Sequence, residues 1–413
     1  MPRERNENWK AIVALCAMAF LGLAASATSP ALATIGQNFP TATPEQIAAI
    51  ATLSTLTGVP LTIISGLIAG RKVKFRTLAI SGLAITLFGG FLPYYATSIQ
   101  QILFGRAILG VGHGLMTPVS TTVILSVFKG DEIAKQYSRS SISTNIGAII
   151  FQLLGGILCN ISWRVPFMVY LAVIPVLILV IFFLPEPGHS VKAEPGLQKV
   201  KGFDLKKIVT KHVIFWSLVH LLYMMWFYPY VTQTSGIILR NGYGNSTTSA
   251  IVLSLFTLAG VIGGYCFYRL QKRFKIRVVF IGFMINFFSY VSLCFSKDII
   301  TYTIISCIFG FGYGVLGPSM SYFLGIGLDK DYRAASIAFS TILSSLGSFG
   351  SSYAVKYSKL VLGTDWERTP FAVGAAFFAA FAILSCSSRG IQKASHLQLK
   401  LKHESTHKGS TLL

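Results

Sequence analysis

Two stretches of the sequence, 200 residues apart, decide the fold: residues 110–118 read GVGHGLMTP and residues 310–318 read GFGYGVLGP. Each stretch has glycine at its first, third and fifth positions and ends in proline. Gly147 likewise has a counterpart in Gly347 at the same separation. The sequence WRVPF that starts at Trp163 also returns, as WERTPF, at Trp366. We infer that the chain contains two copies of one structural unit, joined in parallel.

The composition indicates the solvent in which these units fold. Of the 413 residues, 53% are hydrophobic and 12% are charged, whereas soluble domains have about 45–50% apolar and about 25% charged residues. The apolar residues form blocks of about 20, the length with which a helix crosses roughly 30 Å of hydrocarbon. The chain is therefore predicted to fold in a lipid bilayer. Its net charge of +21 does not indicate nucleic-acid binding, because the basic residues separate the apolar blocks.

The apolar blocks predict twelve membrane-spanning helices, at residues 11–33, 47–69, 76–96, 100–125, 140–161, 165–185, 213–236, 249–269, 277–296, 300–325, 335–355 and 369–387. The first block follows a basic segment, as in a cleaved signal peptide, but its length and the blocks after it favour a first span. Residues 186–212 hold prolines, glycines and six lysines, which predicts a linker. The predicted fold is an all-α integral membrane protein with two pseudo-symmetric six-helix bundles, residues 1–185 and 213–388, and a tail at 389–413.

The distribution of basic residues predicts the orientation in the membrane. Twenty-eight Lys and Arg residues fall in segments on the side of the N-terminus, six fall on the opposite side, and Arg106 falls within a span. Cytoplasmic loops carry the excess of positive charge. We therefore expect a multi-pass protein of the cytoplasmic membrane with both termini, the linker and the tail in the cytoplasm.

Four motifs make the chain resemble the major facilitator superfamily up to about Ser387. The motifs are residues 106–114, RAILGVGHG, resembling the fourth-span motif R-x-x-x-G-x-G; residues 66–76, GLIAGRKVKFR, in place of the basic loop after span two; residues 147–156, GAIIFQLLGG, aligned with the outer glycines of the fifth-span antiporter motif; and residues 29–37, SPALATIGQ, similar to the drug and sugar efflux branch. The resemblance implies a twelve-helix transporter whose substrate site lies near the midplane, between halves that rock against each other. Phe151 and Gln152 replace the central Gly-Pro of the antiporter motif, which weakens the case for export.

The resemblance also implies gating residues on the cytoplasmic side. Gly66 and Arg71 stand in the loop after span two, and Arg269 stands in its half-repeat. In the family such loops act as latches. Gly70 stands where the family has an acidic residue, so one salt bridge of the latch is in question. Anchoring of positive charge at the cytoplasmic surface is the alternative explanation.

Ionisable residues within the spans are candidates for the substrate site, because burying them is costly. All fourteen Asp and Glu residues fall in tails, loops or span ends, and the spans retain Arg106, His113 and His220. At 100° per residue, Arg106, His113 and Thr117 share one helical face, which we expect to line a cavity. The alternative is that Arg106 donates hydrogen bonds to carbonyls of a neighbouring span.

Aromatic and amide side chains complete the predicted substrate site. His220, Tyr223 and Phe227 share a face of the seventh span, where rings with polar tips suit flat, partly apolar ligands. Asn145 and Gln152 are amides, bulkier than the serines and threonines of the fifth span, and Tyr313 occupies the half-repeat position of His113. Packing between helices is the alternative for the aromatic face.

The predicted function is secondary active transport of a small molecule by alternating access. The favoured form is proton-linked efflux of a drug, sugar or metabolite, with His113 carrying the proton because imidazole titrates near physiological pH. The alternative is uptake or exchange of an organic anion by symport, motivated by Arg106. A receptor or channel is disfavoured by the duplication. We expect a monomer without cofactor, metal or enzymatic activity, since the six cysteines occur singly and no Gly-Lys phosphate-binding motif is present.

Overall fold

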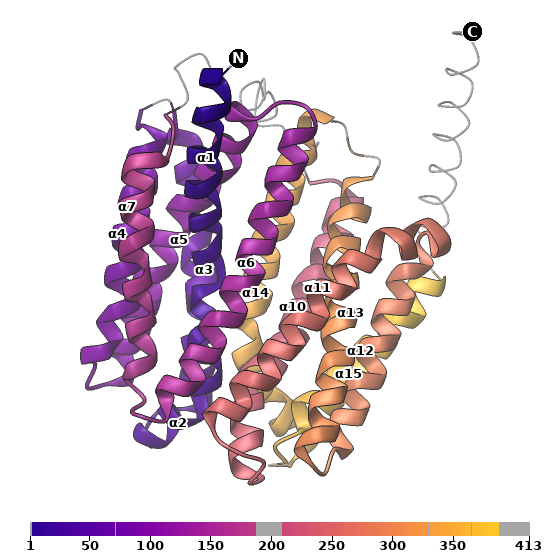
Figure 1. Cartoon of the computed structure of the whole chain (residues 1–413). Coiled ribbons are helices and arrows are strands. Elements are labelled where there is room, and N and C mark those ends of the chain that lie inside the picture. Colours follow the sequence, from indigo (N-terminus) through magenta and orange to yellow (C-terminus); the bar gives the residue numbers. More distant parts are fainter. Residues whose placement is uncertain are drawn as a thin grey trace, which may run out of the picture.

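The computed structural model describes residues 2–70, 72–186, 209–326, 328, 330–364 and 366–387. These residues form helices that run side by side through the molecule, and no strand forms among them (Figure 1). The predicted tail, and the predicted linker apart from its ends, lie outside the described residues. The fold class expected from the sequence, an all-helical membrane protein, is confirmed.

The N-terminal half consists of ten helical elements. They are α1 (Pro2–Phe20), η1 (Leu21–Ala31), α2 (Leu32–Asn38), α3 (Pro44–Ile68), α4 (Phe75–Phe91), η2 (Leu92–Tyr95), α5 (Ile99–Val127), α6 (Asp131–Cys159), η3 (Val165–Ala172) and α7 (Val173–Phe183), where η denotes a 3₁₀ helix. Consecutive elements merge into continuous spans, so α1, η1 and α2 together make the first one, Trp9–Asn38.

The C-terminal half consists of six longer helices. They are α10 (Lys211–Arg240), α11 (Ser246–Phe274), α12 (Arg277–Phe295), α13 (Ile299–Gly325), α14 (Lys330–Leu362) and α15 (Thr369–Ser387). Within the described residues, ten helices of the chain are long and apolar enough to cross a membrane, and they coincide with the first ten predicted spans. Helices α14 and α15 occupy the positions of the last two. Serines lower the hydropathy of α14, and several of their hydroxyls donate to carbonyls of the same helix.

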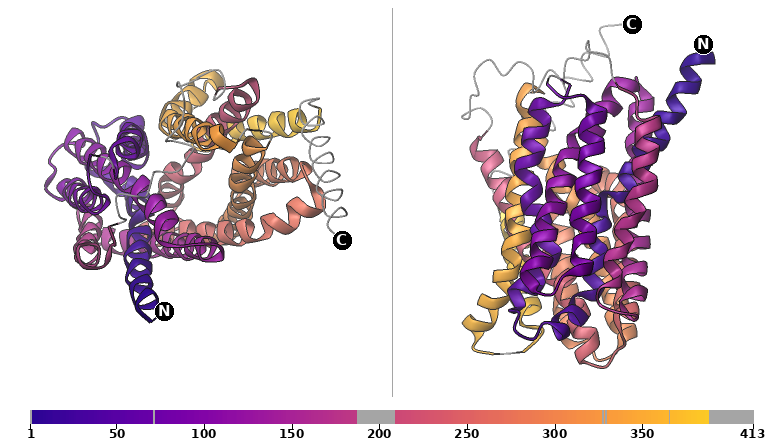
Figure 2. Two further views of the ribbon diagram at one scale, coloured as in Figure 1. Left: turned by 90° about the horizontal axis from the view of Figure 1, so that it is seen from above. Right: turned by 90° about the vertical axis from the view of Figure 1, so that its left-hand side faces the viewer.

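Successive helices alternate in direction, so their ends gather on two sides of the molecule. The N-terminus and the ends of α3 and α5 lie on one side, here called the N side. The opposite side, here called the far side, holds the ends of α2, α6 and α10 and the starts of α3, α11 and α13 (Figure 2). Side-chain caps begin several far-side helices: Ser98 caps α5, and Asp298 caps α13 at the equivalent position.

The sequence duplication reappears as repeated helix packing. In the N-terminal half, α3 and α5 approach closely because Gly114 has no Cβ, which would clash with the carbonyl oxygen of Gly58. In the C-terminal half, α11 and α13 approach in the same way, with the carbonyl oxygen of Gly260 against Gly314. The glycines at 200-residue separation are therefore required by close contact between backbones.

The repeated arginines have matching roles as well. Arg164 donates from Nη2 to the carbonyl oxygen of Ala96, 3.2 Å away. Arg368, in the second copy, is buried and donates from Nη1 to the carbonyl oxygen of Ser296. Each arginine thus binds the backbone at the end of the third span of its own half, which explains why both copies keep it.

Each half has its own hydrophobic core. One cluster of buried side chains runs from Trp216 to Ala382, and the clusters of the other half run from Ala11 to Leu184. The halves contact each other mainly through α6 with α11 and α3 with α14. Packing is therefore continuous within a half, and the interface between halves involves few helices.

Candidate functional site

Arg106 is completely buried among helices of the N-terminal half. Its Nε donates to the carbonyl oxygen of Ile50 at 2.7 Å, Nη2 to that of Ala25 at 3.1 Å, and Nη1 to the hydroxyl of Tyr170 at 2.6 Å. The guanidinium therefore ties α5 to α3, η1 and η3. This is the arrangement of the alternative, in which Arg106 bonds to carbonyls of neighbouring spans, and its three nitrogens all have partners within the protein.

His113 and Thr117 lie further along α5, on the same face. The Nε2 atom of His113 is shielded from solvent and has no hydrogen-bond partner among the described residues. The Thr117 side chain is exposed, and its hydroxyl donates to the carbonyl oxygen of His113 at 2.9 Å. Unlike Arg106, these two side chains keep hydrogen-bonding capacity that the described part of the protein does not use.

Tyr313 occupies the position equivalent to His113 on α13. Its ring stacks on Phe227, with 4.4 Å between the ring centroids and an interplanar angle of 20°. Tyr313 is half-buried, whereas Phe227 is buried. The structure therefore brings together two of the predicted aromatic residues, Tyr313 and Phe227, within the C-terminal half.

The predicted aromatic face of α10 is packed inside its own half. Tyr223 is fully buried, and its hydroxyl accepts a hydrogen bond from Nδ2 of Asn286 on α12 at 3.0 Å. Its ring also contacts Phe283 and Phe378. This is the packing alternative, because helical periodicity identifies a face but not what covers it. His220 is half-buried, with Nδ1 3.3 Å from the hydroxyl of Ser340 on α14.

The two predicted amides of α6 differ in their surroundings. Oε1 of Gln152 accepts hydrogen bonds from the hydroxyls of Ser254 at 3.4 Å and Thr257 at 3.2 Å, both on α11. Gln152 is therefore a contact between the halves in this structure. Asn145 lies two turns nearer the N side, and its Nδ2 donates to the carbonyl oxygen of Ser141 on its own helix.

Contacts between the halves continue from Gln152 to the far side. Nδ2 of Asn160 donates to the hydroxyl of Thr247 at 2.7 Å, and the hydroxyls of Thr34 and Ser246 are 3.0 Å apart. In addition, Lys356 on α14 forms an ion pair with Glu45 on α3 at 3.5 Å. Sequence reasoning missed these residues, because single serines and threonines at helix ends give no signal that separates contacts between halves from caps.

The predicted gating residues lie on the N side. A Cβ at Gly66 would be 4.0 Å from Pro118 on α5. Arg269 is exposed and stacks over the ring of Tyr265, 5.7 Å from its centroid, and Arg71 lies outside the described residues. Gly70, which stands where the family motif has an acidic residue, has a φ of +70°, a conformation that favours glycine.

A carboxylate does reach the loop after α3, from another helix. Oε1 and Oε2 of Glu186 accept hydrogen bonds from the backbone N–H groups of Phe75 and Arg76, both at 2.8 Å. These groups are at the start of α4, where a negative charge stabilises the unpaired N–H groups. Glu186 follows α7, so this loop is tied to the end of the N-terminal half.

Comparisons with known proteins agree with this arrangement. The family model described as Major Facilitator Superfamily matches residues 14–352. The multi-drug resistance efflux pump PmrA homolog of Lactococcus lactis is 24% identical over 314 residues, 72% of this chain and 75% of that protein. The quinolone resistance protein NorA of Staphylococcus aureus is 23% identical over 286 residues, 67% and 72% of the two chains. The TsgA homolog of Buchnera aphidicola is 24% identical over 247 residues, which make up 57% of this chain and 60% of that protein. That match therefore spans less than two thirds of either chain.

Solved structures share the fold at low sequence identity. A mutant of the nucleoside transporter NupG has a TM-score of 0.73 and 14% identity, over 91% of this chain and 99% of that one. An inward-facing bacterial homologue of the human lysosomal transporter Spinster has a TM-score of 0.66 and 13% identity, over 95% and 96% of the two chains. Because the family model covers most of its length, the chain belongs to the major facilitator superfamily and is a multi-pass membrane transporter of small molecules.

Proposed function

We propose that this major facilitator transporter exports a small, weakly amphipathic compound such as a drug, sugar or metabolite, in exchange for protons and as a monomer. The observation that carries the proposal is the position of the hydrogen bonds that join described residues of the two halves, which run from Ile149 and Gln152 to the far side. On the N side of Ile149, no hydrogen bond joins a described residue of one half to a described residue of the other. Such a molecule is closed at the far side, and rocking of the halves would open it there.

The substrate site in this proposal lies between the halves on the N side of Gln152. His113 and Thr117 on α5 would offer unused hydrogen-bonding groups, Asn145 would do so from α6, and His220 and Tyr313 would face them from the C-terminal half. Arg106, Gln152, Tyr223 and Phe227 would support this site through the contacts described above. Thr117→Val and Asn145→Leu should then weaken substrate binding while each protein remains folded.

The N side would be the cytoplasmic side, in accordance with the excess of positive charge in its loops. The test is a single cysteine at position 240 or 356 in a variant that lacks the native six. A membrane-impermeant thiol reagent added to intact cells should label both positions. Labelling only after the inner face is exposed would overturn the orientation.

Export is favoured by the relatives, two of which are named multidrug efflux proteins and a third an exporter. Purified protein can first be screened by thermal shift against drug and metabolite libraries, because a ligand that binds the folded state stabilises it. Each hit is then tested in proteoliposomes for counterflow and for movement driven by a pH gradient. Counterflow without any response to the gradient would contradict proton exchange and leave the carrier intact.

His113 would carry the coupling proton, because its ring lies on the polar face of α5 and Nε2 is unpaired among the described residues. Replacing His113 with Gln keeps hydrogen bonding but removes the titrating group. We expect the variant to keep counterflow and to lose gradient-driven accumulation. His212→Gln is the matched control, since His212 lies outside the proposed site and its Nε2 is 3.0 Å from the carbonyl oxygen of Phe323. Intact gradient-driven accumulation in the His113 variant would exclude it as the coupling residue.

Symport of an organic anion is the second candidate. Among the described residues, no carboxylate lies in the middle of a membrane helix, and Arg106 places a positive charge on α5, the helix that carries His113 and Thr117. Both observations favour an anionic substrate. The two functions differ in sign: in symport, an inward proton gradient drives accumulation of the substrate, whereas in exchange it drives depletion. The direction of movement under the same gradient therefore decides between them.

A further inference from the structure

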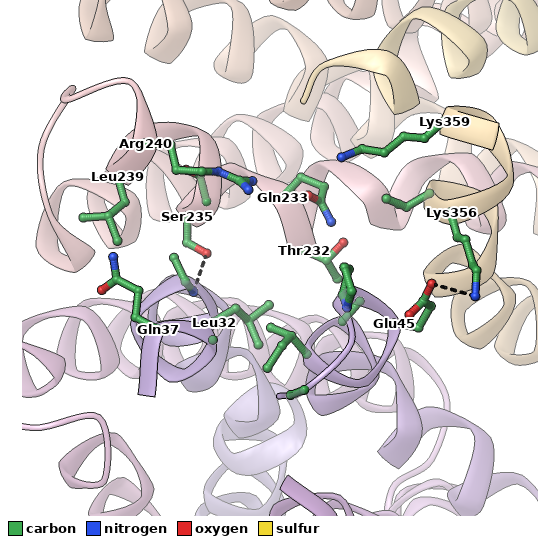
Figure 3. A pocket seen from close by; sticks show the side chains of 18 of the residues that line it. Leu32, Gln37, Glu45, Thr232, Gln233, Ser235, Leu239, Arg240, Lys356 and Lys359 are labelled. Atoms are coloured by element: carbon green, nitrogen blue, oxygen red, sulfur yellow. Dashed lines mark hydrogen bonds and ion pairs between the residues drawn. The ribbon is translucent and has the colours of Figure 1, made fainter. Parts of the chain in front are cut away.

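The far side holds a pocket of about 770 Å³ between the two halves (Figure 3). It is formed by the end of the first span, the start of α3, and the last turns of α10 and α14. None of the residues predicted from the sequence as substrate-binding lines it. Its volume is within the range of about 300–1,000 Å³ that is typical of small-molecule sites.

The two walls of the pocket differ in chemistry. The N-terminal half contributes a mostly apolar wall, with Leu32 and Ile47 among its side chains. The C-terminal half contributes three cations, Arg240, Lys356 and Lys359. A ligand that satisfies both walls has an apolar body and an anionic group on one side.

The three cations are not equally available. Lys356 is paired with Glu45 at 3.5 Å, and Nε of Arg240 is paired with Glu367 at 2.7 Å. The ammonium group of Lys359 has no ion pair or hydrogen bond among the described residues, and it points into the pocket in Figure 3. The described lining therefore carries one carboxylate against three cations and has a net positive charge.

We propose that this far-side pocket is a binding site for an amphipathic organic anion, separate from the site beside α5. The anionic group would bind Lys359 and the Nη atoms of Arg240, and the apolar body would lie against Leu32 and Ile47. This site is independent of the proposed direction of transport and of proton coupling, since it is measured as equilibrium binding without a gradient.

Glu45 is the competitor of such a ligand. Its side chain is 14% exposed, and it neutralises Lys356 at the edge of the pocket. Replacing Glu45 with Gln keeps the shape and the hydrogen bonding but releases the Lys356 charge to the pocket. The site therefore predicts a gain of anion affinity in this variant, a result that misfolding does not produce.

The experiment is isothermal titration of the purified full chain with naphthalene-2-sulfonate, alongside the neutral 2-naphthalenemethanol. We expect the sulfonate to bind wild-type protein more tightly than the neutral compound, and to bind more weakly as salt rises because screening shortens the range of the charges. Lys359→Gln should weaken sulfonate binding about threefold to tenfold, and Glu45→Gln should strengthen it about threefold. Lys297→Gln is the control, because Lys297 is an exposed far-side lysine outside the pocket.

Several results would overturn the site. One is equal affinity for the sulfonate and the neutral compound. Another is unchanged sulfonate affinity in both the Lys359 and the Glu45 variants, and a third is an equal loss of affinity in the Lys297 control. If Lys359→Gln does not fold, the Glu45→Gln variant still tests the site. Sulfonate affinity that does not increase in that variant would refute the competition between Glu45 and the ligand.

Discussion

Replacing Gly156 with Ala should weaken the far-side contact between the halves without disturbing either half. Gly156 is on α6, and a Cβ there would lie 2.5 Å from the carbonyl oxygen of Ser246 and also against the Cβ of Ala250, both on α11. Ordinary contacts between such atoms are about 3.5 Å. The two helices must therefore separate by about 1 Å.

The magnitude follows from the cost of overpacking. Forcing an extra carbon into a tight contact costs about 1–3 kcal/mol, and about 1.4 kcal/mol is a tenfold change in an equilibrium constant. Because the nearest atoms to the new Cβ belong to the other half, this cost falls on the closed arrangement of the far side. We expect the ratio of closed to open molecules to fall by about fivefold to a hundredfold.

The assay is pulsed electron spin resonance between spin labels at positions 161 and 241. Both residues are exposed on the far side, Ile161 after α6 and Asn241 after α10. The Gly156→Ala distances should include a longer component than those of the parent protein. Gly350→Ala is the control, because no atom lies within 4 Å of its Cβ position among the described residues. An unchanged distance distribution with a lowered melting temperature would refute the reasoning and make Gly156 a residue of internal packing.

Arg106→Gln removes three hydrogen bonds in the N-terminal half, so thermal unfolding should show a loss of about 2–4 kcal/mol; an unchanged melting temperature would contradict the structural role. Tyr223→Phe leaves Nδ2 of buried Asn286 unpaired and should cost about 1–3 kcal/mol without changing substrate affinity, whereas loss of affinity would return Tyr223 to the substrate site. Asp298 accepts a backbone hydrogen bond from Thr301, which lowers the pKa of its carboxyl below the ordinary value of an aspartate. The stability that this charge adds is fully present above the ordinary pKa and is lost as the pH falls through the lowered pKa. Melting curves of wild type and Asp298→Asn should therefore differ near neutral pH and converge once the pH is below the lowered pKa.

The sequence determined the architecture because the constraints on it are local or periodic. An apolar block of bilayer length predicts a helical span, because the backbone has no water to bond to in the bilayer and must form its hydrogen bonds internally. The first ten predicted spans coincide with long apolar helices. The glycines separated by 200 residues indicated a duplication, and the structure gives the reason in the matching contacts at Gly114 and Gly314. Such contacts leave no room for a side chain, so glycine is required at these positions and can be recognised in the sequence.

Only the tertiary structure decided what each polar or aromatic side chain faces. The sequence left Arg106 open between a cavity and neighbouring carbonyls, and in the structure Ile50, Ala25 and Tyr170 accept its hydrogen bonds within the N-terminal half. Tyr223 is likewise buried by residues distant in sequence, because Phe283 on α12 and Phe378 on α15 pack against its ring. Helical periodicity assigns residues to a face, but the occupant of that face comes from a segment distant in sequence. The far-side pocket, built from four segments of two halves, could arise only from their assembly.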